Sequence, residues 1–377
     1  MPPPRSFIAI SRGFAIPRRF SQRREASAQS RSLRALILRI ESLTLVLAFA
    51  FICTAVFAAR TSVRAADATS YRYFRVGNPH NIHVASHPGY ALIGGGTDLD
   101  EAFVWLCRRS GGGDFLVIRA SGSDAYNPYV QSLCHVSSAA TLIIPSRDAA
   151  NDPFVARTIS AAAAIFIAGG DQANYINFWR DTPVQRALND AIHRGIPIGG
   201  TSAGLAVLGE FTYSAQGDTA NGPNLDSPAA LANPFNPQVV IVRGFLRIPE
   251  LRDLITDTHF HARGRLGRSV VFMARILASG DVKKIHAIGI DPHTAFLVDR
   301  GGQGVVAGTG AAYFFEATGT PAVCRPGTPL TFNGISVRKL VAGEKFNVSK
   351  WAGEGVGYTL SAVSGVLHST QASGAIY

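Results

Sequence analysis

The sequence is poor in cysteine and contains no Cys-x-x-Cys pair. Its 377 residues include four cysteines: Cys53, Cys107, Cys134 and Cys324. Folds that depend on disulfides are much richer in cysteine, and structural zinc sites commonly use closely spaced cysteine pairs. The sequence therefore excludes a disulfide scaffold and gives no support to a zinc site. A single disulfide between Cys107 and Cys134 is conceivable, but sequence alone does not fix the pairing.

A dinucleotide-binding fingerprint is also missing. The glycine run 94–96 follows a short apolar segment, but it does not fit the pattern G-x-G-x-x-G, and no acidic residue ends the next strand in the expected way. Dinucleotide binding is therefore disfavoured, and we expect neither a cofactor nor a metal. We interpret the glycines as a close approach of backbone to an active centre, or as a simple turn.

Excess positive charge is scarce outside the N-terminal region. The chain has a formal net charge of +11, but residues 1–66 hold eleven arginines against two acidic residues. The rest of the chain is therefore nearly neutral. A nucleic-acid-binding domain concentrates basic residues on its folded surface. We therefore expect no nucleic-acid partner.

The N-terminal arginines precede a long apolar run. Residues 42–59 are uncharged and rich in Leu, Val, Phe and Ala, and small residues around Ala65 and Ala66 follow. This layout is typical of a secretory signal peptide, and the run is also just long enough to span a bilayer. We predict that residues 1–66 are a signal peptide, with an uncleaved membrane anchor as the alternative. Either way, the folded part should lie outside the cytoplasm, in the periplasm or the extracellular space, and membrane association requires an uncleaved segment.

Short apolar runs and helical patterns alternate between residues 90 and 198. Regular alternation predicts a parallel sheet with helices on both faces, whose functional loops gather at the carboxyl ends of the strands. From Ala287 on, apolar runs separated by turn residues predict further strands, and residues 351–377 resemble a Gly/Ser/Ala-rich tail. The predicted strands before residue 200 are 90–93, 115–119, 141–144, 164–168 and 196–198, and the predicted helices are 98–109, 129–136, 153–161 and 183–194.

The stretch 196–207 has the layout of a nucleophile elbow. Ser202 lies between Gly200 and Gly204 in the pattern G-x-S-x-G, between an apolar run and a helical pattern. Such a serine occupies a strained turn where neighbouring side chains would collide, which accounts for the glycines. The turn would present the Ser202 hydroxyl at the end of the sheet and leave the amide of Ala203 free to bind an oxyanion. The alternative is a tight turn with an incidental serine.

A histidine and three arginines crowd a glycine-containing stretch further along the chain. His259 is a candidate base for Ser202, and His261 is its alternative. Arg263, Arg265 and Arg268 are not spaced as the i,i+4 pairs of an ordinary helix surface. Guanidinium groups close to a histidine suit the binding of a carboxylate. The alternative interpretation is a basic surface loop.

Three motifs resemble those of the cyanophycinase and dipeptidase E family of serine peptidases. They are Gly169–Gln172, Gly200–Gly204, and Asp257–Phe260 followed by the three arginines, and the resemblance spans about residues 88 to 350. The resemblance implies a flavodoxin-like three-layer α/β sandwich with a mostly parallel central sheet that the C-terminal strands extend. We therefore expect a peptidase domain over residues 67–350, followed by a tail at 351–377.

The resemblance also implies roles for individual residues. Ser202 would be the nucleophile and His259 the general base, and the amides of Gly170 and Ala203 would bind the oxyanion. Members of the family complete the triad with a carboxylate, for which the acids after the elbow are candidates: Asp218 and Asp226, with Glu210 as a further choice. The residues that would line the substrate site are Gln172, Asp257, Arg263, Arg265 and Arg268.

Cleavage of an aspartyl or isoaspartyl peptide bond through an acyl-enzyme is the function that these motifs favour. Thr258 departs from the Asp-Gln-His-Phe pattern of the cyanophycinases, and the loss of that amide argues against cyanophycin itself as the substrate. A G-x-S-x-G esterase also runs serine, acid, histidine in chain order, but it would need more sheet before the elbow and an HGG-type oxyanion loop. A non-catalytic exported binding protein of the same fold is the other alternative. A peptide or polypeptide with aspartyl groups is the expected partner, with a homodimer left open.

Overall fold

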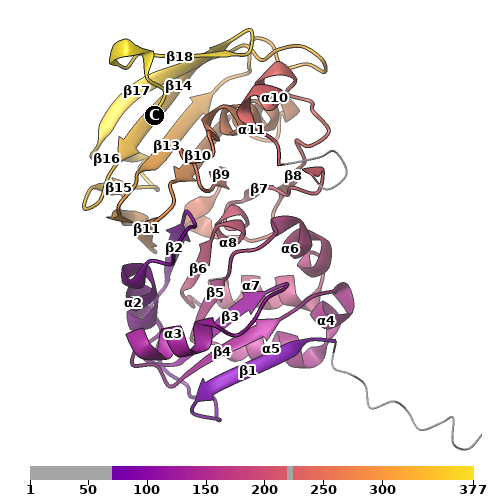
Figure 1. Cartoon of the computed structure of the whole chain (residues 1–377), viewed down its shortest axis with the longest axis vertical. Coiled ribbons are helices and arrows are strands. Elements are labelled where there is room, and N and C mark those ends of the chain that lie inside the picture. Colours follow the sequence, from indigo (N-terminus) through magenta and orange to yellow (C-terminus); the bar gives the residue numbers. More distant parts are fainter. Residues whose placement is uncertain (1–69, 219–223) are drawn as a thin grey trace, which may run out of the picture. The chain divides into compact units, whose positions relative to one another are not determined.

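The computed structural model describes residues 70–218 and 224–377, which form two β-sheets with helices packed against them (Figure 1). The predicted signal peptide or anchor at residues 1–66 lies outside the described residues. Within the described ranges, no helix combines the length and the apolar composition needed to cross a membrane.

The first sheet has ten strands and a parallel centre. In order across the sheet, its strands are β1 (Arg72–Gly77), β4 (Ser138–Ile143), β3 (Asp114–Arg119), β5 (Ala164–Ile167), β6 (Ile198–Thr201), β2 (Gly89–Ile93), β11 (Thr294–Asp299), β12 (Gln303–Gly308), β15 (Lys345–Asn347) and β16 (Ala352–Gly353). The five strands from β4 to β2 pair in parallel, whereas β1 and β11 pair antiparallel at either side of them. Because β5 and β6 are parallel neighbours, the loops that follow them lie at the same edge of the sheet.

Helices cover both faces of this parallel centre. They are α2 (Asp100–Arg109), α3 (Tyr126–Leu133), α4 (Arg147–Asn151), α5 (Pro153–Ala161), α6 (Gln172–Trp179), α7 (Pro183–His193) and α8 (Ala203–Ala206). Successive side chains of a strand point to opposite faces. Phe115 of β3 therefore packs in one core with Phe103 of α2, while Leu116 packs in another with Ile159 of α5 and Leu188 of α7. The three-layer α/β prediction is confirmed.

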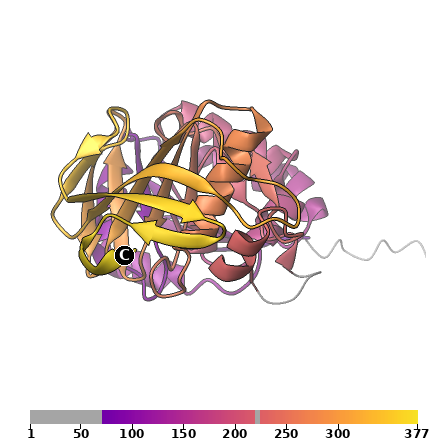
Figure 2. The same cartoon turned by 90° about the horizontal axis from the view of Figure 1, so that it is seen from above.

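The second sheet has eight strands and lies in the C-terminal half (Figure 2). In order, they are β18 (Val366–Ser369), β17 (Val356–Val363), β14 (Phe332–Leu340), β13 (Ala312–Thr318), β10 (Lys284–Ile290), β9 (Leu254–Asp257), β7 (Phe211–Tyr213) and β8 (Ile241–Arg243). The helices α10 (Ser227–Ala232) and α11 (Leu266–Ser279) share its apolar core, and the short 3₁₀ turns are η1 (Pro249–Leu251) and η2 (Ala372–Gly374).

The C-terminal strands divide between the two sheets. β11 and β12 extend the central sheet as expected, whereas β10, β13 and β14 belong to the second sheet, which the sequence pattern did not indicate. The predicted tail at 351–377 is also structured, because β17 pairs with β14 along most of its length. Its apolar side chains, such as Leu360, are buried in the second core. Residue 351 is therefore not a boundary of the fold.

The strand before the elbow runs later than the sequence pattern predicted. β6 starts at Ile198 and continues through two glycines to Thr201. A Cβ on Gly199 would lie only 2.7 Å from a side-chain methyl of Leu106. The glycine therefore lets α2 pack closely on the strand, which places Ser202 directly at the strand end.

A disulfide ties α2 to the residue that follows α3. Cys107 and Cys134 are bonded, at a sequence separation of 27 residues, and Cys324 is a free thiol. The pairing that the sequence left open is therefore confirmed. It holds together the two helices that cover one face of the parallel sheet.

Replacing both bonded cysteines with alanine should lower the free energy of unfolding by about 3–4 kcal/mol, because closing a loop of this length restricts the unfolded chain. Urea unfolding of the oxidised parent and of the Cys107→Ala/Cys134→Ala variant measures the difference. Cys324→Ala is the matched control and should change stability much less. A loss below about 1 kcal/mol would contradict the expectation.

Candidate active site

Ser202 occupies the sharp turn between β6 and α8. Its backbone has φ 51° and ψ −120°, a conformation that residues other than glycine rarely adopt. A Cβ on Gly200 would overlap the carbonyl group of Gly204, and a Cβ on Gly204 would overlap the carbonyl oxygen of Ile167. Both glycines are therefore required by close backbone approach, as the elbow pattern predicted.

Ser202 and His259 come from different sheets and meet at the elbow. Ser202 Oγ lies 2.8 Å from His259 Nε2, and His259 follows β9 of the second sheet. The backbone N–H of His259 donates to the carbonyl oxygen of Gly94 at 2.8 Å, and its φ is 44°. A Cβ on Gly95 would overlap the imidazole ring. The glycine run therefore brings backbone against the active centre, one of the two interpretations drawn from the sequence.

The turn after His259 is fixed by a carboxylate. Asp291 accepts hydrogen bonds from the N–H of His261 at 2.7 Å and from the N–H of Ala311 at 3.1 Å. The ring of His261 stacks on Tyr377 with centroids 4.4 Å apart. His261 is thus turned to another partner, which leaves His259 as the histidine that contacts Ser202.

The acids proposed to complete a triad bind elsewhere. Asp218 is buried and accepts from the hydroxyl of Tyr213 at 2.5 Å. The side chain of Asp226 accepts a hydrogen bond from the backbone in the first turn of α10, and Glu210 forms an ion pair with an arginine of β8. Throughout residues 70–218 and 224–377, no carboxylate is hydrogen-bonded to His259. The expectation that Asp218 or Asp226 contacts His259 is therefore wrong for the described structure, because local backbone and hydroxyl donors hold both side chains.

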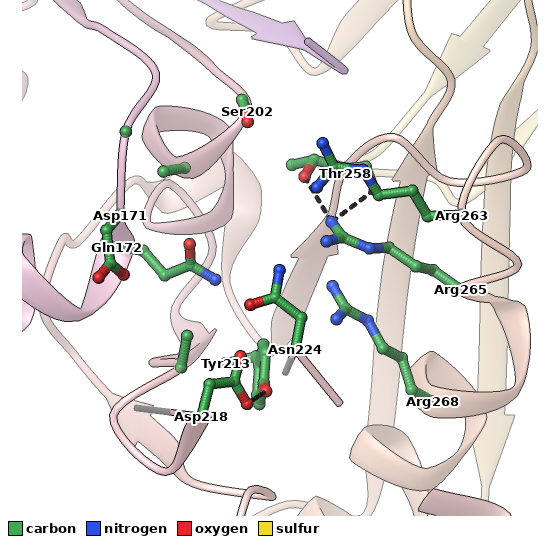
Figure 3. Close-up of a pocket in the computed structure, with 13 residues that line it drawn as sticks. Asp171, Gln172, Ser202, Tyr213, Asp218, Asn224, Thr258, Arg263, Arg265 and Arg268 are labelled. Atoms are coloured by element: carbon green, nitrogen blue, oxygen red, sulfur yellow. Dashed lines mark hydrogen bonds between the residues drawn. The ribbon is translucent and has the colours of Figure 1, made fainter. Parts of the chain in front are cut away.

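A cavity of about 400 Å³ opens beside Ser202 (Figure 3). We name it the arginine cavity. Its lining residues are Gly170, Asp171, Gln172, Ser202, Ala203, Tyr213, Ala215, Asp218, Asn224, Thr258, Arg263, Arg265 and Arg268. Figure 3 shows the three guanidinium groups directed toward Gln172 and Asn224 on the opposite side. The structure thus brings together Ser202, the two predicted oxyanion residues, Gln172 and all three arginines.

Asp257 does not line this cavity, in contrast to the prediction. Its buried carboxylate accepts two hydrogen bonds from Arg268, at 2.8 Å from Nε and 2.6 Å from Nη2, and a third from Ser269. Burial raises the pKa of Asp257, but the charges of Arg268 and Arg265 and the hydrogen bonds outweigh it, so the pKa lies below its usual value. Asp257 is therefore an anion that fixes the arginines from behind.

The three arginines differ in how far protein partners occupy their guanidinium groups. Arg268 is only 2% exposed and bonded to Asp257, whereas Arg265 donates from Nη1 to the carbonyl oxygen and hydroxyl of Thr258 at 2.9 and 3.0 Å. The threonine that departs from the family pattern thus supports an arginine. Arg263 is exposed, and its guanidinium has no hydrogen bond or ion pair to any described residue. Arg263 is therefore the guanidinium most available to a ligand.

His259 is a neutral base in this setting. Burial, followed by the charges of Arg263 and Arg265, lowers the pKa of His259 to about 4, although Asp257 acts in the opposite direction. At neutral pH, the imidazole is therefore uncharged and Nε2 can accept the proton of Ser202 Oγ. The arginine cluster thus tunes the base as well as lining the cavity.

A second cavity of about 400 Å³ lies against Ser202, and the sequence pattern did not indicate it. Its lining residues are Gly95, Gly96, Asp98, Arg119, Tyr126, Gly169, Thr201, Ser202 and His259. The only local signal was Asp98 just after the glycine run, because Arg119 and Tyr126 reach the site through the fold.

Among the described residues, no cluster of three or more His, Cys, Asp or Glu side chains could hold a metal ion.

Comparison with known proteins identifies the family. The model of peptidase family S51 matches residues 97–260. A cyanophycinase of Synechococcus elongatus is 30% identical over 240 residues, which cover 60% of this chain and 68% of that relative. The chain belongs to peptidase family S51. The elbow and the Asp257–Phe260 motif lie within or at the end of the matched segment, whereas Arg263, Arg265 and Arg268 follow it.

Two further matches differ in the share of the other protein that they cover. A cyanophycinase of Trichormus variabilis is 29% identical over 214 residues, and the match spans 55% of this chain and 64% of that protein. Among solved structures, a peptidase from an acI-B1 Actinobacterium is 18% identical, with a TM-score of 0.46 and coverage of 70% of this chain and 98% of the other.

Gly95→Ala should displace the His259 ring and slow the labelling of Ser202 by a fluorophosphonate by about 100-fold, because activation by a general base is worth at least that much. Gly343→Ala is the matched control, since Gly343 has a similar positive φ of 86° with nothing within 4 Å of its Cβ. The control introduces similar backbone strain at a position outside the site. Equal labelling rates in the two variants would show that Gly95 does not position the imidazole.

The pKa of His259 should respond to Arg263. An NMR titration should place the midpoint near pH 4, and Arg263→Gln should raise it toward the ordinary value of about 6.5, because a charge that opposes the imidazolium is removed. Arg252→Gln removes an exposed arginine elsewhere and should leave the midpoint unchanged. A midpoint that stays or falls in Arg263→Gln would contradict this electrostatic account.

Proposed function

We propose that this chain is an exported serine peptidase that hydrolyses aspartyl or isoaspartyl peptide bonds through an acyl-enzyme. The observation that carries the proposal is the 2.8 Å contact between Ser202 Oγ and His259 Nε2 beside the arginine cavity. Membership of peptidase family S51 supports the reaction class. The name of the relatives, cyanophycinase, supports an aspartyl substrate class.

Acylation begins when His259 Nε2 takes the proton of Ser202 Oγ. The oxygen bonds to the scissile carbonyl carbon, and the tetrahedral oxyanion receives hydrogen bonds from the amides of Ala203 and Gly170. His259 then returns the proton to the leaving nitrogen as the carbon–nitrogen bond breaks. Water attacks the resulting ester with His259 as base again, which releases the acid and restores Ser202.

Two of the cavity's arginines would recognise an acidic acyl group. Arg263 offers a guanidinium that has no hydrogen-bond or ion-pair partner among the described residues, and Arg265 keeps further N–H groups beyond those that bind Thr258. A planar guanidinium binds a carboxylate through two parallel hydrogen bonds. Arg268 has its main partner in Asp257 and would act by fixing the cluster.

In this proposal, the backbone replaces a third triad member in orienting His259. The Gly94 carbonyl holds the main chain of His259, and Gly95 confines the ring. A depressed pKa of about 4 keeps the imidazole neutral without a carboxylate partner. Ser202 and His259 therefore work as a pair, with the positioning that a triad acid supplies elsewhere provided by packing.

Export is part of the proposal and rests on two observations. Residues 1–66 have the composition of a signal peptide or membrane anchor. The bond between Cys107 and Cys134 is of a kind that persists in oxidising compartments and is rare in the cytosol. The periplasm or the extracellular space is therefore the proposed location, with membrane anchorage if the apolar segment is retained.

Ser202→Ala should reduce the hydrolysis of aspartyl dipeptides by at least about 1000-fold, because the attacking oxygen is lost from an otherwise unaltered turn. Thermal unfolding should be little changed. Ser132→Ala, on the exposed surface of α3, is the matched control and should retain full activity. Activity within about tenfold of the parent in Ser202→Ala would overturn the assignment of the nucleophile.

Arg263→Lys should lower kcat/KM for an aspartyl substrate by about 10- to 100-fold, because a charge-assisted pair of hydrogen bonds is reduced to one point charge. Hydrolysis of a neutral ester should change little, since the lysine keeps the positive charge beside His259. Comparison of the two substrates on the same variant separates recognition from catalysis. Equal losses on both would favour the esterase interpretation and a structural role for Arg263.

A further inference from the structure

A third cavity, of about 1000 Å³, shares no lining residue with the two cavities at Ser202. We name it the distal cavity. Its lining residues are Arg180, Asp181, Gln185, Arg186, Asn189, Asp190, Glu210, Arg243, Gly244, Arg247, Ile248, Pro249 and Arg252. Five of them are arginines and three are acidic, in a part of the chain that is otherwise nearly neutral. A concave site that gathers charge of one sign attracts ligands of the opposite sign.

The distal cavity lies at the far ends of two elements that also reach the arginine cavity. Gln172 begins α6 and lines the arginine cavity, whereas Arg180 directly follows α6 and lines the distal cavity. In the same way, Tyr213 ends β7 beside the arginine cavity, and Glu210 precedes β7 at the distal cavity. A helix of the length of α6 measures about 12 Å, which an extended polypeptide covers in about four residues. A chain whose acyl group occupies the arginine cavity is therefore within reach of the distal cavity.

Side-chain amides of α7 fix the floor of the distal cavity. Gln185 Nε2 donates to the carbonyl oxygens of Gly244 and Phe245, at 3.2 and 2.9 Å. Asn189 donates from Nδ2 to the carbonyl oxygen of Phe245 at 3.1 Å and accepts from the backbone N–H of Arg247 at 2.8 Å. These bonds attach α7 to the segment between β8 and η1, so the arginines of both elements are held around one cavity.

Most of the guanidinium groups of the distal cavity are available to a ligand. Arg186 of α7 and Arg247 after β8 are exposed, and their guanidinium groups have no hydrogen bond or ion pair to residues 70–218 or 224–377. Arg180 and Arg252 lie 3.7 and 3.9 Å from the carboxylates of the aspartates that follow them, which is longer than a hydrogen bond. The fifth arginine is paired at 2.8 Å with the glutamate of the lining.

The carboxylates of the lining select the kind of anion. Asp190 lies one helical turn after Arg186, is exposed, and forms no hydrogen bond or ion pair through its carboxylate with any described residue. A phosphate group presents anionic acceptor oxygens, which such a carboxylate repels. A polypeptide with acidic side chains offers carboxylates to the arginines and backbone N–H donors to Asp190. The mixed lining therefore favours an acidic polypeptide over an inorganic polyanion.

We propose that the distal cavity binds an acidic segment of a polypeptide substrate, on the acyl side of the bond that is cleaved at Ser202. The inference rests on the proposed function and adds to it that recognition extends beyond the aspartyl residue itself. Arg186 and Arg247 would bind Asp or Glu side chains of that segment, and Asp190 would accept from its backbone. Because the distal cavity does not touch the reacting atoms, this binding lowers KM and leaves kcat unchanged.

Binding of a peptide without aspartate tests the distal cavity without catalysis. Fluorescence anisotropy of the full chain should show at least about tenfold tighter binding of labelled hexaglutamate than of labelled hexaserine. Arg186→Gln/Arg247→Gln should weaken the binding of hexaglutamate about tenfold, because two charge-assisted contacts are lost. The matched control is Arg108→Gln/Arg157→Gln, which removes two exposed arginines outside the cavity and should bind as the parent does. Every variant keeps residues 1–66, so binding to the arginines there cancels in the comparison.

Competition separates the two kinds of anion. Unlabelled tripolyphosphate should displace labelled hexaglutamate from the parent at least about tenfold less effectively than unlabelled hexaglutamate does, because the carboxylates of the lining repel it. Equally effective displacement would overturn the assignment of the cavity to a polypeptide.

Hydrolysis provides the second arm. A peptide with six glutamates before an aspartyl-leucine bond should have a kcat/KM at least about tenfold higher than its counterpart with six serines, with the difference in KM. Arg186→Gln/Arg247→Gln should abolish this preference, whereas Arg108→Gln/Arg157→Gln should retain it. Both double variants should cleave the dipeptide aspartyl-leucine at the parent rate, because a dipeptide does not extend to the distal cavity.

The two arms distinguish failure of the inference from failure of the proposed function. Hydrolysis of aspartyl-leucine with equal kcat/KM for the two extended peptides, or equal effects of the two double variants, would overturn the distal cavity as a substrate site and leave the proposed function intact. Selective binding of hexaglutamate without hydrolysis of any aspartyl substrate would overturn the proposed function instead.

Discussion

The hydrogen bond between Ser202 and His259 joins two sheets, and the rest of the site depends on how that junction is held. Ser202 is fixed by a strained turn at the end of β6, and His259 follows β9 with a positive φ. Neither conformation is favourable by itself, so the surrounding packing must impose both. The glycines at 94–96 do so from the first sheet, because Gly94 bonds to the backbone of His259 and Gly95 leaves room for its ring.

The same junction sets the electrostatics of the site. Asp257 lies behind the cavity and balances Arg268, while Arg263, which lines the cavity with Ser202, has no ion pair within residues 70–218 and 224–377. One cluster therefore performs two tasks. After burial, which has the largest effect, it lowers the pKa of His259, and it leaves guanidinium groups available to the proposed acidic acyl group. Loss of charge at Arg263 would affect both tasks, whereas a lysine there would preserve only the first.

Local patterns predicted the parts of the structure that depend on neighbouring residues. The G-x-S-x-G turn is a local pattern, in which Gly200 and Gly204 lie against each other, and strand–helix alternation predicted the parallel sheet with its helices on both faces. The second sheet was missed because β9 pairs with β10, β10 with β13 and β7 with β8, and such distant pairing leaves no local signal. Asp257 was predicted to line the substrate site because a sequence cannot show that Arg268 of α11 forms hydrogen bonds with its carboxylate. Asp98 and Arg119 were overlooked for the same reason, since only the fold brings them to Ser202.

The covalent intermediate is the most direct test of a serine peptidase built on this junction. The protein can be quenched with acid during turnover of an aspartyl dipeptide, digested, and analysed by mass spectrometry for the acylated peptide. The account predicts an aspartyl ester on Ser202 in the parent and none in His259→Ala, because the unassisted hydroxyl is a poor nucleophile. Turnover with an acyl group on another residue, or with acylation of Ser202 unaffected by the loss of His259, would contradict the account.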